Sequence, residues 1–451
     1  MFARFLIATL LTLGAAWSAT PPWYWYNYTL DSTGNAAGYS KLRYDKDGKL
    51  KIAYRSGHNL MYGVFDEAAA TFRVEQADTG LDSYAKIDMA LDSKGNPHII
   101  HHDATYQHLM YAYHDGTKWI RFVADTLHHP TTDFYQISLL IDSKDVKHMI
   151  YTTSVGNFNG MTYSSLDADE NRLDKFVFPD LGSGGKWNSM VFDKDENPVV
   201  AYFIYAASAL VVGSRSPDGA WKCGVIPPKA DYPHEGFYAN MKRSGDKYLI
   251  VAHNRNAEGH ANGVRAIDLL TGVPGDSAWT VERIDTLIEW TQYSTQTPMI
   301  LGKDGEPIVI IPKVKRKDEF NADSAYLTIH WRKDSTWQYQ VMDTVGITGL
   351  YADMVPTPEG LPAVTYYEDG KHVLHLSIAS SVEPKDENHN GIPDYQEKPI
   401  QFVGLNHPAL LPRSALKKIR GVDALGRKAQ ARTHARVLLP LQAAPARNAE
   451  R

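Results

Sequence analysis

The chain has 451 residues, of which 43% are hydrophobic and 11% aromatic, enough apolar material for a large buried core. Residues 400–451 hold ten Lys or Arg and two acids, a net charge of +8, so the rest of the chain carries −13 of the total −5. An acidic body argues against a nucleic-acid partner, and the single cysteine, Cys223, excludes a disulfide within the chain.

The N-terminus has the pattern of a secretory signal. One early positive charge, Arg4, precedes an apolar run from Phe5 to Leu13 and a stretch of small residues. The run is too short to span a membrane, and no later segment of about 20 apolar residues occurs. We therefore predict a signal peptide over residues 1–18 and an exported protein without a membrane span, either secreted or held at the outer cell surface.

A repeated unit follows the signal segment. The stretch "YAKIDMALDSKGNPHIIHHD" (84–103) combines an aromatic residue, an alternating apolar run, an Asp–Gly turn and a second apolar run. The same order recurs around Asp45, Asp142 and Asp193, and these turn aspartates are 47, 50 and 51 residues apart. Degenerate copies at 238–254, 293–311 and 351–369 bring the number of units to seven.

Each unit contains four short segments with the period-two alternation of β-strands, joined by Gly, Asn and Asp turns. A third strand is expected at 108–116, and fourth strands begin near Trp119, Trp221, Trp279 and Trp337. Seven four-stranded units of about 50 residues predict an all-β, seven-bladed β-propeller of antiparallel blades over residues 22–380. Two β-sandwiches are the competing all-β arrangement, but they do not require seven similar units.

The second unit, "LDSKGNPHIIHHD…LMYAYHDGTKW", resembles a repeat of bacterial exported propellers that are grouped as sialidase-like or BNR-like repeat proteins. The resemblance covers about 350 residues and implies the propeller architecture more than any one activity, because such propellers include enzymes, lectins and scaffolds. The Ser-x-Asp-x-Gly-x-Thr-Trp box of true sialidases is absent, and no arginine triad can be placed, so sialidase activity is not expected.

Two columns of side chains are expected around one face of the propeller, the funnel face, where first strands begin and second strands end. Aromatic rings stack on sugars, and cations hold uronate or sulfate groups, so the columns favour a protein that binds a polysaccharide or other glycan. We expect the protein to be a monomer. The predicted ligand-binding residues are Tyr39, Arg55, Tyr84, Tyr135, Trp187, Tyr238, Tyr293 and Tyr351. The alternative for the aromatic residues is that they pack between neighbouring blades.

A polysaccharide lyase or a glycoside hydrolase on the same face is the second hypothesis, and a protein-interaction scaffold is the third. Elimination from a uronate needs a base such as His or Tyr and a cation that stabilises the anion. The candidate catalytic residues are His102, Asp103, His253 and Arg255. Hydrolysis needs two carboxylates roughly 5–10 Å apart, and the sequence does not pair the available acids.

The histidine-rich stretch "NPHIIHHD" (96–103) is not expected to bind a metal. His98 falls in the same repeat column as His148, and His101 falls in a column that holds Tyr54, Tyr151, Tyr202 and Tyr366. His98 is therefore interpreted as a residue that packs or bonds within its blade, and His101 as a substitute aromatic. Strand alternation directs His101 and His102 to opposite faces, which argues against a shared ion.

A calcium loop is predicted beyond the propeller, within a linker at residues 384–399. The stretch "DENHNGIPDYQE" (386–397) has the ligand spacing of a calcium-binding loop, with Gly391 for the sharp turn. It resembles the Asp/Asn-rich loops of bacterial exported proteins and thrombospondin type 3 repeats, and implies a structural calcium ion. The predicted metal ligands are Asp386, Asn388, Asn390, the Ile392 carbonyl, Asp394 and Glu397.

The basic segment at 400–451 contains "IRGVDALGRKAQARTHARVLLP" (419–440), which resembles C-terminal sorting segments of Gram-negative surface proteins. The Asp-x-x-Gly-Arg element is present, whereas "ARVLLP" departs from the expected ending. The two interpretations are a signal for sorting to the surface and a disordered basic tail.

Overall fold

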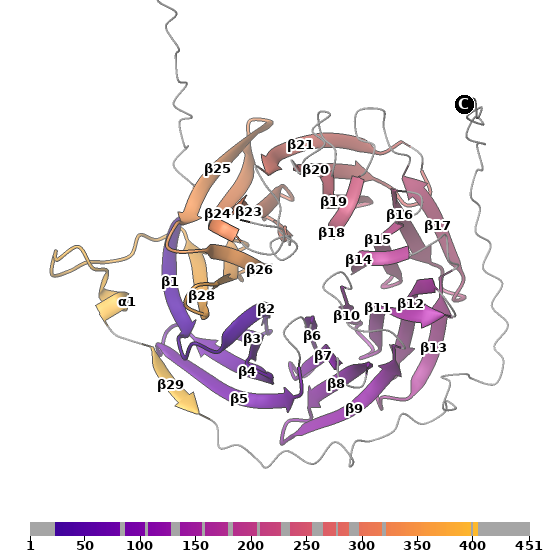
Figure 1. Cartoon of the computed structure of the whole chain (residues 1–451), viewed down its shortest axis with the longest axis horizontal. Coiled ribbons are helices and arrows are strands. Elements are labelled where there is room, and N and C mark those ends of the chain that lie inside the picture. Colours follow the sequence, from indigo (N-terminus) through magenta and orange to yellow (C-terminus); the bar gives the residue numbers. More distant parts are fainter. Residues whose placement is uncertain are drawn as a thin grey trace, which may run out of the picture.

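A computed structural model describes residues 23–81, 86–103, 107–127, 136–155, 158–178, 184–204, 208–226, 235–254, 265–276, 278–287, 297–317, 322–397 and 400–404. Seven sheets of four antiparallel strands stand as blades around a central axis (Figure 1), and one of them gains a fifth, parallel strand. The predicted all-β, seven-bladed β-propeller is confirmed. Within the described ranges, no helix is long and apolar enough to cross a membrane. The signal segment and residues 405–451 lie outside these ranges.

The first four blades follow one another along the chain, each built from four consecutive strands. Blade 1 contains β2 (Ala36–Tyr44), β3 (Leu50–Ser56), β4 (Asn59–Asp66) and β5 (Thr71–Thr79). Blade 2 contains β6 (Ile87–Leu91), β7 (Pro97–Asp103), β8 (His108–His114) and β9 (Trp119–Thr126). Blade 3 contains β10 (Ser138–Ile141), β11 (Lys147–Val155), β12 (Phe158–Leu166) and β13 (Arg172–Val177). Blade 4 contains β14 (Gly184–Phe192), β15 (Pro198–Ile204), β16 (Ala209–Arg215) and β17 (Trp221–Ile226).

The remaining blades complete the ring, and the last one takes its outer strand from the start of the described chain. Blade 5 contains β18 (Glu235–Ser244), β19 (Lys247–Asn254), β20 (Arg265–Gly272) and β21 (Thr280–Leu287). Blade 6 contains β22 (Met299–Leu301), β23 (Pro307–Arg316), β24 (Ala322–Lys333) and β25 (Thr336–Asp343). Blade 7 contains β26 (Thr348–Pro356), β27 (Pro362–Glu368), β28 (Val373–Ser380) and β1 (Tyr24–Asp31).

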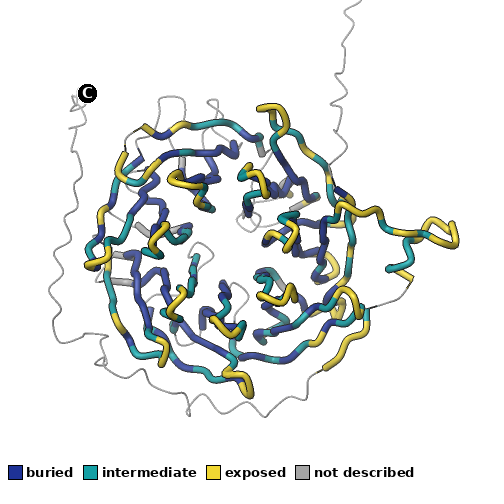
Figure 2. The backbone as a smooth tube through the Cα atoms, turned by 180° about the vertical axis from the view of Figure 1, so that it is seen from behind, coloured by how far each residue is buried: buried dark blue, intermediate teal, exposed yellow. Residues whose placement is uncertain are grey.

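The second strands form the core of each blade because both of their faces meet a neighbouring blade. Every residue of β7, β15 and β27 is buried. Figure 2 shows the same trend, with buried backbone inside the blades and exposed residues at the turns and on the segment outside the ring. A strand that is buried on both sides needs a continuous apolar run, as in "PVVAYFI" of β15.

The predicted aspartate turns are present between first and second strands. The carboxylate of Asp92 accepts hydrogen bonds from the backbone N–H groups of Lys94 and Asn96, at 2.9 and 2.7 Å. Asp45, Asp142 and Asp193 make the same pair of bonds in their own blades. The repeated aspartate therefore serves the backbone of a tight turn, as Asp side chains do in Asx-turns.

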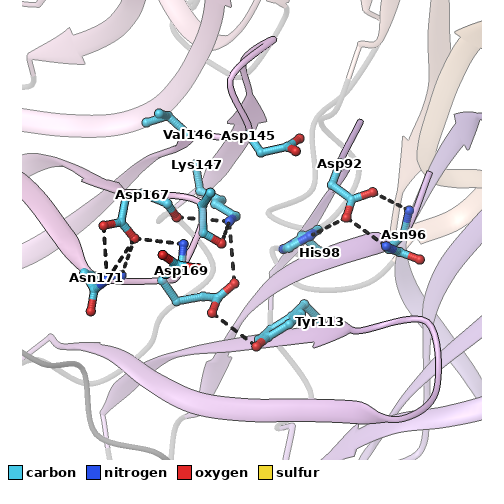
Figure 3. A network of polar contacts seen from close by, with 12 residues as sticks. Asp92, Asn96, His98, Tyr113, Asp145, Val146, Lys147, Asp167, Asp169 and Asn171 are labelled. Carbon is cyan, nitrogen blue, oxygen red and sulfur yellow. Dashed lines mark hydrogen bonds and ion pairs between the residues drawn. The ribbon is translucent and has the colours of Figure 1, made fainter. Parts of the chain in front are cut away.

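The column shared by His98 and His148 also has one structural explanation. His98 Nδ1 shares a hydrogen bond with the Tyr111 hydroxyl (2.8 Å), and its Nε2 lies 3.7 Å from Asp92 (Figure 3). His148 repeats this arrangement with Tyr163 (2.8 Å) and Asp142 (3.4 Å). Burial lowers the pKa of both imidazoles, against the opposite effect of the two carboxylates. The prediction that His98 bonds within its blade is confirmed.

An acidic residue at the end of a fourth strand bonds to the second strand of the next blade at five interfaces. At the blade 1–blade 2 interface, Asp78 lies 2.9 Å from His101 Nε2. At the next one, the Tyr151 hydroxyl donates to Asp125 at 2.5 Å. The other pairs are Asp31 with Tyr54, Asp285 with Lys313, and Asp343 with Tyr366. His101 thus replaces a tyrosine, as its repeat column predicted.

The ring is closed by pairing between the two ends of the propeller. Strand β1 pairs antiparallel with β28 over Tyr24–Asp31, and Leu30 joins the apolar cluster between blades 7 and 1. Strand β29 (Gln401–Gly404) then pairs parallel with the outer strand β5 of blade 1. Figure 1 shows both strands on the same side of the ring. The sequence pattern indicated neither the closing strand nor β29.

The hydrogen bonds between blades should be measurable in stability. Tyr151→Phe removes the hydroxyl donor from the partly buried Asp125 and should lower the free energy of unfolding by about 1–2 kcal/mol. Tyr202→Phe is the matched control, because Tyr202 lies in the same column but its hydroxyl bonds to the Cys223 thiol, a weak partner, instead of an aspartate, and should cost clearly less. Urea unfolding of both variants checks this. Equal losses would contradict a special contribution from the aspartate contact.

Candidate functional site

The first strands of the seven blades surround a cavity of about 320 Å³ on the propeller axis. Alternate residues of β2, namely Tyr39, Lys41 and Arg43, line this cavity. Other blades contribute polar groups, including Gln136, Asn188 and Asn240. This axial cavity brings side chains from distant parts of the chain together, and it is the candidate functional site.

Six charged side chains line the axial cavity, and cations outnumber carboxylates four to two. The cations are Lys41, Arg43, Lys86 and Lys242, and the carboxylates are Asp88 and Asp353. Lys41 Nζ lies 3.2 Å from Asp353, and Arg43 lies 3.2 Å from Asp88 and 3.8 Å from Asp353. Lys86 Nζ sits 3.7 Å from the centre of the Tyr39 ring, which is a cation–π distance.

Both carboxylates also join neighbouring blades through the backbone. Asp353 of blade 7 accepts the Leu42 N–H of blade 1 at 3.0 Å, and Asp88 of blade 2 accepts the Leu139 N–H of blade 3 at 2.8 Å. Together with the Arg43–Asp88 contact, the two aspartates therefore link four successive first strands, β26, β2, β6 and β10, while they partly neutralise Lys41 and Arg43.

Lys242 lies in the cavity close to these charges. Burial lowers the pKa of its ammonium group to about 8, and repulsion from Arg43 and Lys41 lowers it as well, against the attraction of Asp353 and Asp88. A lysine in this position is destabilising while it is charged, because its solvation is reduced and like charges surround it. The excess positive charge is thus a local energetic cost that folding does not require.

Four of the predicted ligand-binding aromatic residues lie in the described ranges. Tyr39, Trp187 and Tyr238 are buried, with 8%, 4% and 5% exposure, and Tyr351 is partly buried. The centre of the Trp187 ring lies 4.5 and 5.0 Å from those of Phe237 and Tyr238 in the next blade, and the ring centres of Tyr351 and Tyr39 are 4.7 Å apart. These contacts support the packing alternative, although Tyr39 and Tyr238 also line the axial cavity. Binding of a sugar by these rings stays a prediction.

Backbone bulges shared by four first strands show which residues of the aromatic column are equivalent. Trp187, Tyr238 and Tyr351 have φ angles of 52°, 55° and 53°, and the equivalent position in β2 is Gly38 at 65°. In each of these first strands the regular pairing is interrupted around this residue and resumes two positions later. Such backbone is strained for bulky residues, and the contacts between blades oppose that strain. Tyr39 is therefore one residue beyond the column to which the sequence assigned it.

The second predicted column is buried at the ends of second strands. Arg55 is 9% exposed, and His102, Asp103 and His253 are completely buried. None of these four residues lines the axial cavity. His102 belongs to β7 of blade 2 and His253 to β19 of blade 5, and these blades are not neighbours in the ring. The catalytic role of these residues stays a prediction.

Four predicted site residues, Tyr84, Tyr135, Tyr293 and Arg255, lie outside the described residues. In contrast, the four cavity cations were not among the predicted residues. Lys41, Arg43 and Lys242 each follow or precede an apolar residue within a first strand. The sequence feature that could have identified them is a cation at a position of a first strand that faces the axis. The pattern did not show that cations from blades 1, 2 and 5 would share one cavity.

The predicted calcium loop folds back on itself. The Asp386 carboxylate accepts the backbone N–H groups of Asn390 and Gly391 at 3.2 and 2.9 Å. The side-chain amides of Asn388 and Asn390 donate to Glu397 Oε1 at 2.7 and 2.6 Å. The first, third, fifth and last ligand positions thus lie in one hydrogen-bonded network of oxygen-bearing groups, a donor set that suits Ca²⁺. Among the described residues, no three His, Cys, Asp or Glu side chains form a metal-binding group.

The loop is attached to the closing strand of the propeller. The short helix α1 (Asp394–Glu397) carries Tyr395, whose ring lies 4.8 Å from Tyr26 and 5.3 Å from Tyr28. The Asn27 N–H of β1 donates to the Tyr395 hydroxyl at 2.9 Å. Any ion that rigidifies this loop would therefore also act on the strand that closes the ring.

Comparison with known proteins identifies the architecture and no family. No protein-family model and no curated protein matches this sequence. The polysaccharide lyase Uly1 superposes with a TM-score of 0.50 at 9% identity, over 79% of this chain and 92% of that one. A PL25 ulvan lyase gives 0.47 at 9% identity over 77% and 92%, and the NanB sialidase of Streptococcus pneumoniae gives 0.42 at 12% over 78% and 70%. At these identities the likeness shows the fold alone.

The cost of the buried charge can be tested at Lys242. In the folded state this lysine loses its proton near pH 8, whereas the unfolded chain keeps it to about pH 10.4. The unfolded state binds more protons in this window, so stability should rise with pH. Lys242→Met should raise the free energy of unfolding by about 1–2 kcal/mol at pH 7 in chloride buffer, and the gain should vanish near pH 10.

Urea unfolding at pH 7 and pH 10 measures both effects. Lys222→Met, on the exposed side of β17, is the control and should change stability little at either pH. A gain from Lys242→Met that is the same at both pH values would show that Lys242 is not destabilised by its charge.

Proposed function

We propose that this propeller is exported and binds an acidic polysaccharide at or outside the cell surface. The observation that carries the proposal is the excess of cations in an axial cavity that Tyr39 and Tyr238 also line. Cations attract uronate and sulfate groups, and rings provide apolar contact for sugar faces. The fold likeness to a polysaccharide lyase supports the choice of a carbohydrate ligand, as does the resemblance of the repeats to sialidase-like proteins.

Binding is favoured over catalysis by the position of the candidate catalytic groups. Elimination or hydrolysis needs an acid, a base and a charge-stabilising group around one substrate bond. His102 and His253 are completely buried in blades that are not adjacent. A lyase or a hydrolase on the funnel face is the second candidate, and the polysaccharide lyase Uly1, with a similar fold, supports it.

Affinity electrophoresis of the purified propeller through gels with dissolved polysaccharide tests binding. Migration should be retarded by a uronate- or sulfate-bearing polymer and not by neutral dextran, and added salt should weaken the retardation because the contacts are electrostatic. Lys86→Met should weaken binding several-fold, whereas the exposed Lys118→Met should not. No retention on any acidic polymer would refute the proposal. New unsaturated or reducing ends in the polymer would favour the enzyme instead.

We also propose a structural calcium ion in the loop at 386–397. Asp386, Asn388, Asn390, Asp394 and Glu397 would supply side-chain oxygens, and Ile392 would supply its carbonyl. The convergence of Asp386 and Glu397 on the same two asparagines supports this set. Because α1 contacts β1 through Tyr395, the ion would stabilise the closure of the ring as well as the loop.

Chelation tests the calcium proposal. EGTA should lower the melting temperature by several degrees, and Ca²⁺ should restore it at concentrations at which Mg²⁺ does not, since the loop offers many flexible oxygen ligands. Glu397→Gln should weaken calcium binding about tenfold or more. Glu387→Gln is the matched control, because Glu387 occupies a loop position that is not a predicted ligand. A melting temperature that is unchanged by EGTA would rule out a structural ion.

A further inference from the structure

The charges of the axial cavity do not balance among the described residues. Lys41, Arg43 and Lys242 share two carboxylates, Asp353 and Asp88, which leaves an excess of one positive charge in a partly enclosed space. Most of the described lysines and arginines of this protein lie on exposed turns or outer strands, where water screens them. An unbalanced group of cations at the centre of the ring is therefore a feature that the fold does not need.

The two carboxylates are already engaged by other groups. Asp353 contacts Lys41 and Arg43 and accepts the Leu42 N–H. Asp88 contacts Arg43 and accepts the N–H groups of Met89 and Leu139. Their acceptor capacity is largely used by these bonds. Lys242 therefore lies near Lys41 and Arg43, and the two carboxylates do not balance the positive charges of these three residues.

Lys242 has a different position from its neighbours. It comes from β18 of blade 5, whereas Lys41 and Arg43 come from β2 of blade 1. The interactions that affect its ammonium group are repulsion from Arg43 and Lys41 and attraction to Asp353 and Asp88. Lys242 thus comes from a different part of the ring than Lys41 and Arg43, and cations from two blades line the axial cavity.

We propose that the axial cavity binds one small tetrahedral oxyanion, a sulfate or phosphate group, between Lys242, Lys41 and Arg43. Such an anion supplies the negative charge that these three cations lack. Its oxygens can accept hydrogen bonds from ammonium and guanidinium groups on different sides, which a single chloride cannot match. Asn188, Asn240 and Ser138 add neutral polar groups to the same walls.

The oxyanion has two possible sources with the same chemistry. It is either a free inorganic ion that stabilises the centre of the ring, or an ester group on a polysaccharide that enters the cavity. The inference stands on the charge balance of the cavity and does not require the polysaccharide proposal. Inorganic sulfate is the first probe, because its charge stays at −2 across the neutral and alkaline range.

Thermal unfolding and titration calorimetry with the full chain test the proposal. Sodium sulfate should raise the melting temperature more than sodium chloride at the same ionic strength, with a saturating dependence on concentration. Lys242→Met should weaken sulfate binding at least tenfold, Lys242→Arg should retain most of it, and Lys222→Met should bind as the unaltered chain does. An equal response to sulfate and chloride, or full binding by Lys242→Met, would overturn the proposal.

The pH dependence separates direct binding from a general effect on stability. The charged and titratable groups around Lys242 are Arg43, Lys41, Asp353 and Asp88, with Lys86, Tyr39 and Tyr238 also lining the cavity. Since Lys242 loses its proton near pH 8, sulfate affinity should fall about tenfold between pH 7 and pH 9.5. In Lys242→Met the affinity should vary much less over this range. A steep fall in that variant would contradict a direct role for the lysine.

A sulfated tetrasaccharide and its desulfated counterpart distinguish the two sources. Competition between the sulfated tetrasaccharide and inorganic sulfate would identify an ester group as the ligand and would support both proposals. Binding of inorganic sulfate alone would support the oxyanion site while removing the cavity as a polysaccharide site. Binding of neither would overturn the oxyanion site.

Discussion

Ring closure by β1 and β28 is the constraint on which the rest of the structure depends. A blade has two apolar faces, so an open row of seven blades would leave one such face exposed at each end. Pairing of Tyr24–Asp31 with β28 places the first and last blades in contact, and a shared apolar cluster covers both faces. Tyr395 then contacts β1, and β29 extends β5 of blade 1. The segments after the propeller thus strengthen the same closure.

Closure also determines which polar groups meet. The contacts of Asp78 with His101 and of Asp125 with Tyr151 cross between blades, and each aspartate finds its partner only when the blades are side by side. On the axis, Asp353 reaches from the last blade to the Leu42 N–H of the first. These directional bonds supplement the apolar contacts, which by themselves specify position less sharply.

The charges of the axial cavity are less well matched than these contacts between blades. Elsewhere buried polar groups such as His98 and Lys147 have partners in or next to their own blade (Figure 3). In the cavity, Lys242 faces other cations, and burial lowers its pKa to about 8. Local conflicts of this kind are expected where a protein binds something, because a ligand can supply the missing charge. The same reasoning gives less weight to His102 and His253, which are completely buried and do not line the cavity.

The sequence by itself determined the seven repeats, the aspartate turns, the bonding of His98 and the replacement of a tyrosine by His101. These features depend on strand alternation and on residues within one repeat, which are close along the chain. The tertiary structure decided which strand closes the ring, where the first strands bulge at Trp187 and Tyr238, and which cations share the axis. Lys41 and Lys242 are separated by four blades of sequence, and only the closed ring brings them to one cavity.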